Sequence, residues 1–191
     1  MAIKYILASS SPRRHELFAY ITKELEVISP DCDEILPKET EPYSVPEILA
    51  VRKALSVAKE HPDELVVGCD TVVILDSVIF GKPKDESVAF DMLGTLSGRT
   101  HTVVSGVCIC YKGKTLSFSQ ETDVEFYPLS DSEIRDYIAE FKPFDKAGSY
   151  GVQDGGALFI KGITGDYYNV MGLPIAKLKR EIDKLIALAG G

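Results

Sequence analysis

The 191-residue sequence predicts an α/β protein with a mixed sheet flanked by helices. Short apolar runs, of which Tyr5–Ala8 is the first, alternate with stretches whose apolar residues recur every three to four positions. Such alternation is typical of strands followed by amphipathic helices. Two long strand candidates, 102–111 and 115–127, are joined by Lys112-Gly113-Lys114 and predict a hairpin. Isolated strands together with hairpins indicate a sheet with both parallel and antiparallel pairs.

Helix-start residues define the elements of the first half of the chain. Ser11 is a suitable N-cap, and Pro12 follows at the first helical position, where its missing N–H is no loss. Ser44 and Glu47 have the spacing of a capping box. The predicted elements are a strand at 5–8, a helix from Pro12, a strand at 25–28, a helix from Ser44 to about His61, a strand region at 65–75 that 68–71 interrupts, and a short strand at 78–80 after a turn at Asp76-Ser77.

The apolar spacing of the second helix assigns one of its faces to the core. Its predicted stripe comprises Ile48, Val51, Leu55 and Ala58. Lys53 lies away from this stripe, so spacing alone predicts that Lys53 is solvated.

Three further helices are predicted in the second half of the chain. One ends at Gly98, and another begins at a capping box formed by Ser130 and Glu133. The segment 145–156 is rich in glycine, and 157–160 is predicted to resume a strand. The last helix carries a stripe of Ile175, Leu178, Ile182 and Leu185.

Composition disfavours several classes of protein. Asp and Glu outnumber Lys and Arg by 29 to 21, and the net charge of −8 disfavours nucleic-acid binding, which needs a basic face. No apolar run approaches the ~18 residues of a membrane span, and the N-terminus lacks the apolar region of a signal peptide. A cytoplasmic protein without a membrane partner is therefore expected. No repeat or linker divides the chain, so residues 1–191 are expected to form one domain.

The cysteines are expected to be buried free thiols. None of Cys32, Cys69, Cys108 and Cys110 is part of a C-x-x-C motif. Cys108 and Cys110 alternate with apolar residues and therefore fall on one face of a strand.

The junction at 9–14 is the first candidate binding site. A strand that leads directly into a helix start gathers unpaired N–H groups and the positive end of the helix dipole, which together favour an anion. Arg13 and Arg14 lie in the first helical turn, where the dipole disfavours cations, and a phosphate would offset them. The alternative is that both arginines are solvated or paired with surface carboxylates.

Three other stretches carry candidate residues. Asp70 lies within an apolar strand region, where a carboxylate must be paired, hydrogen-bonded or bound to a metal; the alternative is a cap of a local turn after Gly68. The acidic segment 31–34 either supplies oxygen ligands suited to Mg²⁺ or forms a solvated loop. Lys82, between a glycine and a proline, lies on a rigid loop from which it can reach a phosphate.

Several short blocks of sequence, spread over nearly the whole chain, match the motifs of one protein family in the same order. They are LASSSPRRHELF at 7–18, Lys53-Ala54, GCDTVV at 68–73, GKP at 81–83, LSG at 96–98, DKAGSYGVQ at 145–153 and YYNVMGLP at 167–174. Together these blocks resemble the Maf family. The resemblance implies a nucleoside triphosphate pyrophosphatase with a fold like that of the inosine triphosphatases, in which an elongated mixed sheet holds a central nucleotide-binding cleft between two lobes. It also implies a divalent cation, Mg²⁺ or Mn²⁺, and release of pyrophosphate.

The resemblance also implies roles for individual residues. Asp70 matches the proton acceptor, and Glu34 and Asp70 are the expected metal ligands. Lys53 would then face the substrate rather than solvent. The residues expected to bind the substrate are Ser9, Arg13, Arg14, Lys53, Thr71, Lys82, Lys146 and Gln153, of which Arg13, Thr71 and Gln153 match positions associated with substrate choice.

The blocks at 145–153 and 167–174 resemble the subgroup that acts on dTTP and UTP; the alternative is the subgroup that acts on 7-methyl-GTP. Asp154 stands where the family usually has glycine, and its carboxylate would repel a phosphate or alter the base pocket. A rival function is a nucleotide-sensing regulator of cell division without turnover, because the family is associated with septum formation. Asp70 argues against this rival, since a binder needs no carboxylate there. The expected partner is a small-molecule nucleoside triphosphate, and the sequence is compatible with a homodimer.

Overall fold

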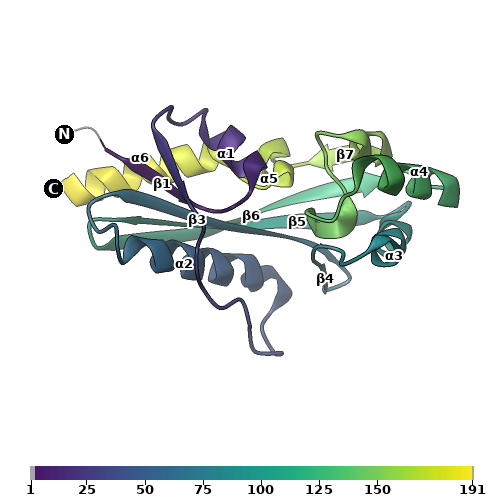
Figure 1. Ribbon diagram of the computed structural model, residues 1–191, viewed down its shortest axis with the longest axis horizontal. Helices are drawn as coiled ribbons and strands as arrows, with labels where there is room; N and C mark the ends of the chain where they lie inside the picture. Colours follow the sequence, from purple (N-terminus) through teal and green to yellow (C-terminus); the bar gives the residue numbers. More distant parts are fainter. Residues whose placement is uncertain (1–2, 191) are drawn as a thin grey trace. The chain divides into compact units, whose positions relative to one another are not determined.

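The computed structural model describes residues 3–190, which form a seven-stranded mixed sheet with helices (Figure 1). The strands are β1 Tyr5–Ala8, β2 Leu25–Ile28, β3 Leu65–Leu75, β4 Val78–Phe80, β5 Thr100–Tyr111, β6 Lys114–Phe126 and β7 Ile160–Thr164. The α-helices are α1 Pro12–Phe18, α2 Val45–Ala58, α3 Glu86–Leu96, α4 Asp131–Phe141, α5 Tyr167–Met171 and α6 Ile175–Gly190. Short 3₁₀ helices are η1 Pro42–Ser44, η2 Ala147–Ser149 and η3 Gly155–Phe159. The predicted α/β class is confirmed.

The sheet mixes parallel and antiparallel pairs, as the sequence predicts. Its strands lie in the order β2-β1-β3-β5-β6-β7, and β4 pairs with β3 outside this path. β1 is parallel to β2 and to β3, with Tyr5 opposite Leu25 and Leu65, whereas β4 and β7 are antiparallel to their partners. Asp76 and Ser77, which join β3 to β4, have φ of 50° and 62°. Two successive residues with positive φ are typical of a tight hairpin turn, so the predicted turn is confirmed.

The chain divides into two compact units. Unit 1 comprises Met1–Asp70, Ser105–Gln120 and Gly172–Gly191, and unit 2 comprises Thr71–Val104 and Glu121–Met171. Strands β3, β5 and β6 contribute residues to both units. The single domain with a central cleft stays a prediction.

Unit 1 buries α2 against one face of its strands. The buried cluster comprises Ile6, Ala8, Ala50, Ala54, Val57, Val66, Cys108 and Cys110. Gly68 in β3 permits a close approach of the helix backbone. A Cβ at this position would lie 2.5 Å from the Ala50 carbonyl oxygen and 2.6 Å from the Ala54 nitrogen. Only glycine therefore lets α2 sit this close to β3.

Helices α1 and α6 cover the opposite face of these strands (Figure 1). Successive side chains of a strand point to opposite faces, so Tyr5 faces away from α2 while Ile6 packs toward it. The Tyr5 ring lies edge-on to Phe18 of α1, with the ring centroids 6.2 Å apart. In α6 the predicted stripe is confirmed at its three buried members, which are Leu178, Ile182 and Leu185.

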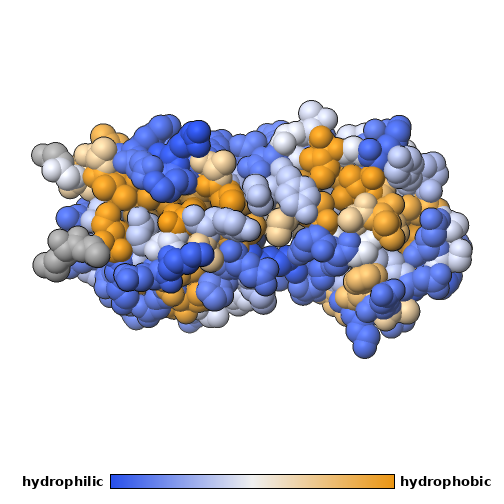
Figure 2. All heavy atoms as spheres, turned by 90° about the horizontal axis from the view of Figure 1, so that it is seen from above, coloured by the Kyte–Doolittle hydropathy of each residue, from blue (hydrophilic) through white to orange (hydrophobic). Residues whose placement is uncertain are grey.

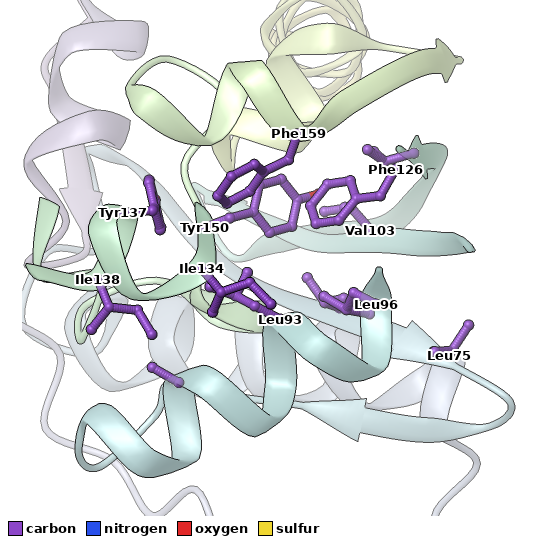
Figure 3. Close-up of a cluster of buried hydrophobic side chains, with 13 residues drawn as sticks. Leu75, Leu93, Leu96, Val103, Phe126, Ile134, Tyr137, Ile138, Tyr150 and Phe159 are labelled. Carbon is purple, nitrogen blue, oxygen red and sulfur yellow. The ribbon is translucent and has the colours of Figure 1, made fainter. Parts of the chain in front are cut away.

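Unit 2 has an aromatic core. The rings of Phe126, Tyr150 and Phe159 lie close together (Figure 3), and the centroids of Phe126 and Tyr150 are 4.8 Å apart. His101 is buried beside them, with its Nε2 atom 2.8 Å from the Tyr150 hydroxyl oxygen. Burial lowers the pKa of His101 to about 4, so its ring is neutral at pH 7. The core therefore holds the glycine-rich segment in place through Tyr150.

The predicted core face of α2 is confirmed only in part: Val51 and Ala58 of the predicted stripe are half-buried against the cluster of unit 1. The buried residues of α2 are Pro46, Leu49, Ala50, Ala54 and Val57. Leu55, a member of the predicted stripe, is 41% exposed. The fully buried face is centred on Ala50 and Ala54, which fit against Gly68, whereas the spacing of the large apolar residues favours a neighbouring face.

The predicted capping box at the start of α2 is wrong. The Ser44 side chain makes no capping hydrogen bond. The Glu47 carboxylate instead accepts hydrogen bonds from the hydroxyls of Ser117 (2.6 Å) and Ser119 (2.9 Å) in β6. These long-range partners occupy the carboxylate that a capping box would need. The second capping box, Ser130 with Glu133, is confirmed at α4.

Three smaller predictions differ from the structure. Ser11 precedes α1, but its side chain makes no cap bond, and its own N–H donates to Ser9 Oγ (3.2 Å). β3 continues through 68–71 without a break, because Gly68 serves close packing rather than a turn. Most of the predicted strand at 157–160 belongs instead to the 3₁₀ helix η3. Asp154 caps the start of η3, and its side chain accepts a hydrogen bond from Gly156 N–H.

The exposed surface mixes polar and apolar residues. Figure 2 shows hydrophobic residues between groups of hydrophilic ones on the face seen from above. Among residues 3–190, no helix is long and apolar enough to cross a membrane. All four cysteines are free, and three of them, Cys69, Cys108 and Cys110, are buried, which confirms the prediction for those three.

Candidate functional site

In unit 1 the structure brings Ser9 and Arg14 together. Arg14 Nη1 donates to Ser9 Oγ (3.3 Å) and to the Cys69 carbonyl (2.9 Å), while its Nε donates to the Gly172 carbonyl (2.9 Å). Cys69 immediately precedes Asp70. Arg14 therefore ties the first turn of α1 to the strand that carries Asp70. Because α1 has only seven residues, its dipole contributes little, and the case for an anion rests on the arginines.

Lys53, Asp70 and Glu34 form the second cluster of unit 1. Lys53 Nζ lies 2.6 Å from Asp70 Oδ1 and 2.7 Å from Glu34 Oε1. The side chains of Lys53 and Asp70 are 13% and 15% exposed, whereas that of Glu34 is 58% exposed. Burial lowers the pKa of Lys53, but the charge of Asp70 and hydrogen bonds to both carboxylates outweigh it, so the pKa is raised overall. Lys53 is therefore a fixed positive charge beside Asp70.

The close packing of α2 on β3 positions this cluster. Gly68 contacts Ala54, the residue after Lys53, and Asp70 lies two positions beyond Gly68 on the same strand. Residues two apart on a strand point to the same face, so the Asp70 side chain points toward α2. The spacing that predicts a solvated Lys53 is thus wrong, because Lys53 lies beside the small-residue face of α2 that packs on the strand.

The donor set of this cluster fits a divalent cation only in part. Among residues 3–190 there is no group of three or more His, Cys, Asp or Glu side chains that could hold a metal ion. Glu34 and Asp70, however, both reach one cation, the Lys53 ammonium. Mg²⁺ is commonly held by one or two carboxylates together with water and substrate phosphates. Two carboxylates around one cation position therefore fit a metal that arrives with a nucleotide.

In unit 2 the loop of Lys82 lies against the glycine-rich segment. Gly148 N–H donates to the Gly81 carbonyl (3.1 Å), and Gly148 has φ of 67°. A Cβ at Gly148 would lie 2.9 Å from Val73 Cγ2 in β3, so glycine is required here for both its conformation and its packing. Lys82 itself is exposed.

The Asp154 carboxylate is bound by neighbouring groups of unit 2. Its Oδ1 accepts hydrogen bonds from the Tyr137 hydroxyl and from Gly156 N–H, both at 3.0 Å. Its Oδ2 lies 3.5 Å from Lys146 Nζ, which also pairs with Asp145 at 2.9 Å. The carboxylate that departs from the family pattern is therefore neutralised by its neighbours, and it holds Lys146.

Tyr137 helps to hold Asp154 and the glycine-rich segment, although the sequence does not single it out. It belongs to the apolar stripe of α4, yet its hydroxyl donates to Asp154 and accepts from Gly151 N–H (3.1 Å). Burial raises the pKa of the Tyr137 hydroxyl, which keeps it protonated as a donor. A tyrosine within an apolar stripe is the signal, because a buried tyrosine needs a partner for its hydroxyl.

The predicted site residues fall in both units. Arg13 is half-buried in α1 of unit 1, Thr71 is half-buried in β3 at the start of unit 2, and Gln153 is exposed in unit 2. Within unit 1 the structure groups Ser9 with Arg14, and Glu34 with Lys53 and Asp70. Within unit 2 it places the loop of Lys82 beside the segment that carries Lys146 and Gln153.

Comparisons with known proteins find one matching family model and close relatives that share one name. The family model described as "Maf-like protein" matches residues 4–185. A protein of Bacillus cytotoxicus named "dTTP/UTP pyrophosphatase" is 48% identical over 179 residues, which is 94% of each chain. Proteins of the same name from Bacillus cereus and Bacillus mycoides are 46% identical over the same share. A solved structure, that of the Staphylococcus aureus Ham1 protein, aligns with a TM-score of 0.48 and 16% identity over 64% of this chain and 71% of that chain.

Proposed function

Because the chain belongs to the Maf-like protein family, we propose that it is a pyrophosphatase that hydrolyses dTTP and UTP to the monophosphate and pyrophosphate. The names of relatives that are 46–48% identical support the substrates. The observation that carries the chemistry is the Asp70 carboxylate, held 2.6 Å from the half-buried Lys53 ammonium. The contact with Lys53 orients this carboxylate, as a general base requires.

Asp70 accepts a proton from the water that attacks the α-phosphorus, and pyrophosphate leaves. Lys53 balances the charge of Asp70 before the nucleotide binds and offers its ammonium to the phosphates afterwards. Arg13 and Arg14 add positive charge near the same strand end, since a triphosphate carries about four negative charges. These residues work chiefly by orienting the substrate and by offsetting its charge.

Glu34 and Asp70 would hold a divalent cation, Mg²⁺ or Mn²⁺. When bound, such an ion offsets phosphate charge and makes water easier to deprotonate. The Lys53 ammonium lies between the same two carboxylates, so we propose that it yields this position to the ion. The cytoplasmic location, the homodimer and a link to septum formation stay predictions.

Gln153 is proposed to select the base. Its amide offers a donor and an acceptor, which match the alternating O4, N3–H and O2 groups of uracil and thymine. Cytosine presents an amino donor and a bare N3 instead, and a site built on hydrogen bonds discriminates strongly against such a mismatch. UTP and dTTP are therefore expected to be hydrolysed faster than CTP and the purine triphosphates.

The test is a panel of nucleoside triphosphates assayed for pyrophosphate with Mg²⁺, with Mn²⁺ and with a chelator. Gln153→Ala is expected to flatten the preference for UTP over CTP more than it lowers the best rate. Gln120, the other glutamine of the sequence, lies in unit 1, and Gln120→Ala is the control of the same residue type, expected to keep the preference. Equal rates on CTP and UTP in the unaltered protein, or an equal slowing of every nucleotide by Gln153→Ala, would exclude base selection by Gln153.

A further inference from the structure

Arg52 holds the loop that carries Glu34. Its Nη1 atom donates to the carbonyls of Asp33 and Ile35, both at 2.9 Å, and these residues flank Glu34 in the sequence. The loop 29–41 contains no helix or strand, and Ile35 is 80% exposed, so its side chain does not anchor the loop in a core. The guanidinium therefore fixes the backbone on both sides of Glu34.

The other contacts of the loop do not replace this clamp. Asp33 Oδ1 accepts from Ile35 N–H (2.7 Å), which fixes the local turn but not its place against α2. The Glu34 carboxylate pairs with Lys53, but this contact is made by the end of a side chain that is 58% exposed, so it does not fix the backbone of the loop. Two charge-assisted hydrogen bonds from one guanidinium constrain the backbone more strongly.

We propose that Arg52 is a positioning residue, which presents Glu34 to the Lys53–Asp70 pair. Arg52 and Lys53 are neighbours on α2, so one rigid helix carries both the clamp and the lysine that Glu34 meets. Without the clamp, Glu34 would leave Lys53 and Asp70, and a cation would have to be held by Asp70 and the substrate alone. The catalytic part of this inference rests on the proposed function; the part about the loop does not.

The experiment uses a reporter that the chain itself offers. The sequence contains no tryptophan, so Ile35→Trp at an exposed position supplies a single tryptophan on the loop. In this background, Arg52→Met removes the donors but keeps an unbranched apolar stem. The matched control is Arg180→Met, because exposed Arg180 also donates through Nη1 to a backbone carbonyl, that of Ala176 (3.2 Å), within α6. The readouts are tryptophan anisotropy without nucleotide or metal, and kcat/KM at several Mg²⁺ concentrations.

We expect Arg52→Met to lower the anisotropy of the introduced tryptophan toward its value in the unfolded protein. Without the tryptophan, Arg52→Met should lower kcat/KM by about 10–100-fold and raise the Mg²⁺ requirement, as is usual for residues that orient metal ligands. Arg180→Met should change neither readout. An unchanged anisotropy would overturn the clamp, and a mobile loop with unchanged kcat/KM would overturn the role in positioning Glu34. If the unaltered chain hydrolyses no nucleotide, the proposed function fails, and anisotropy alone decides whether Arg52 holds the loop.

Discussion

Asp70→Asn is expected to lower kcat by about 10²–10⁴-fold, the usual contribution of a positioned general base, while the protein stays folded. The asparagine oxygen can still accept the hydrogen bond from Lys53 Nζ that Asp70 Oδ1 accepts at 2.6 Å. The amide, however, cannot take a proton from water at neutral pH. Nucleotide binding should persist, because the arginines and Lys53 are unchanged.

The matched control for this change is Asp76→Asn. Asp76 follows the same strand and is also paired with a cation, Arg99, at 2.5 Å, but its side chain is 70% exposed. The rate of pyrophosphate release and the melting temperature are measured for both variants. Asp76→Asn should keep kcat within about twofold, since exposed ion pairs contribute little. A near-normal kcat for Asp70→Asn would mean that Asp70 is only structural.

Gly68→Ala is expected to lower the free energy of unfolding by about 1–3 kcal/mol or more, the usual cost of overpacking a core. The added methyl group would lie 2.5–2.6 Å from backbone atoms of Ala50 and Ala54, so α2 must shift away from β3. Because Lys53 lies on α2 and Asp70 on β3, the same shift should lengthen the Lys53–Asp70 contact and lower kcat.

Urea unfolding and the hydrolysis rate are measured together for Gly68→Ala. Gly94→Ala is the control, because a Cβ at Gly94 in the exposed face of α3 meets nothing within 4 Å. Alanine has the higher helix propensity, so Gly94→Ala should be neutral or stabilising by up to about 1 kcal/mol. A Gly68→Ala protein as stable and as active as the parent would refute the close packing of α2 on β3.

The strands and most helices could be predicted because their signals are local. Alternating apolar residues, turn residues such as Asp76-Ser77 and the Ser130–Glu133 capping box act within a few positions. The fully buried face of α2 could not be predicted in this way. It depends on Gly68, which lies beyond the end of the helix in sequence and contacts Ala50 and Ala54 through space.

The residues of the candidate site likewise differ in whether the sequence indicates them or only the folded structure reveals them. The apolar surroundings of Asp70 already mark it as a candidate, whereas only the resemblance to a family points to Lys53, which spacing alone assigns to solvent. Arg52 gave no signal, because its acceptors are backbone carbonyls 17 and 19 positions away, and any residue type can supply a carbonyl. Asp154 is visible as a departure from the family, but its partners Tyr137 and Lys146 emerge only in the folded structure.

The proposed function requires that water attacks the α-phosphorus of a pyrimidine nucleoside triphosphate. Hydrolysis of UTP in ¹⁸O-labelled water, followed by mass spectrometry of the products, tests it most directly. Attack at the α-phosphorus predicts one labelled oxygen in UMP and unlabelled pyrophosphate, and a chelator is expected to stop the reaction. Label in orthophosphate, or release of UDP, would contradict it, because the attack would then fall on the γ-phosphorus.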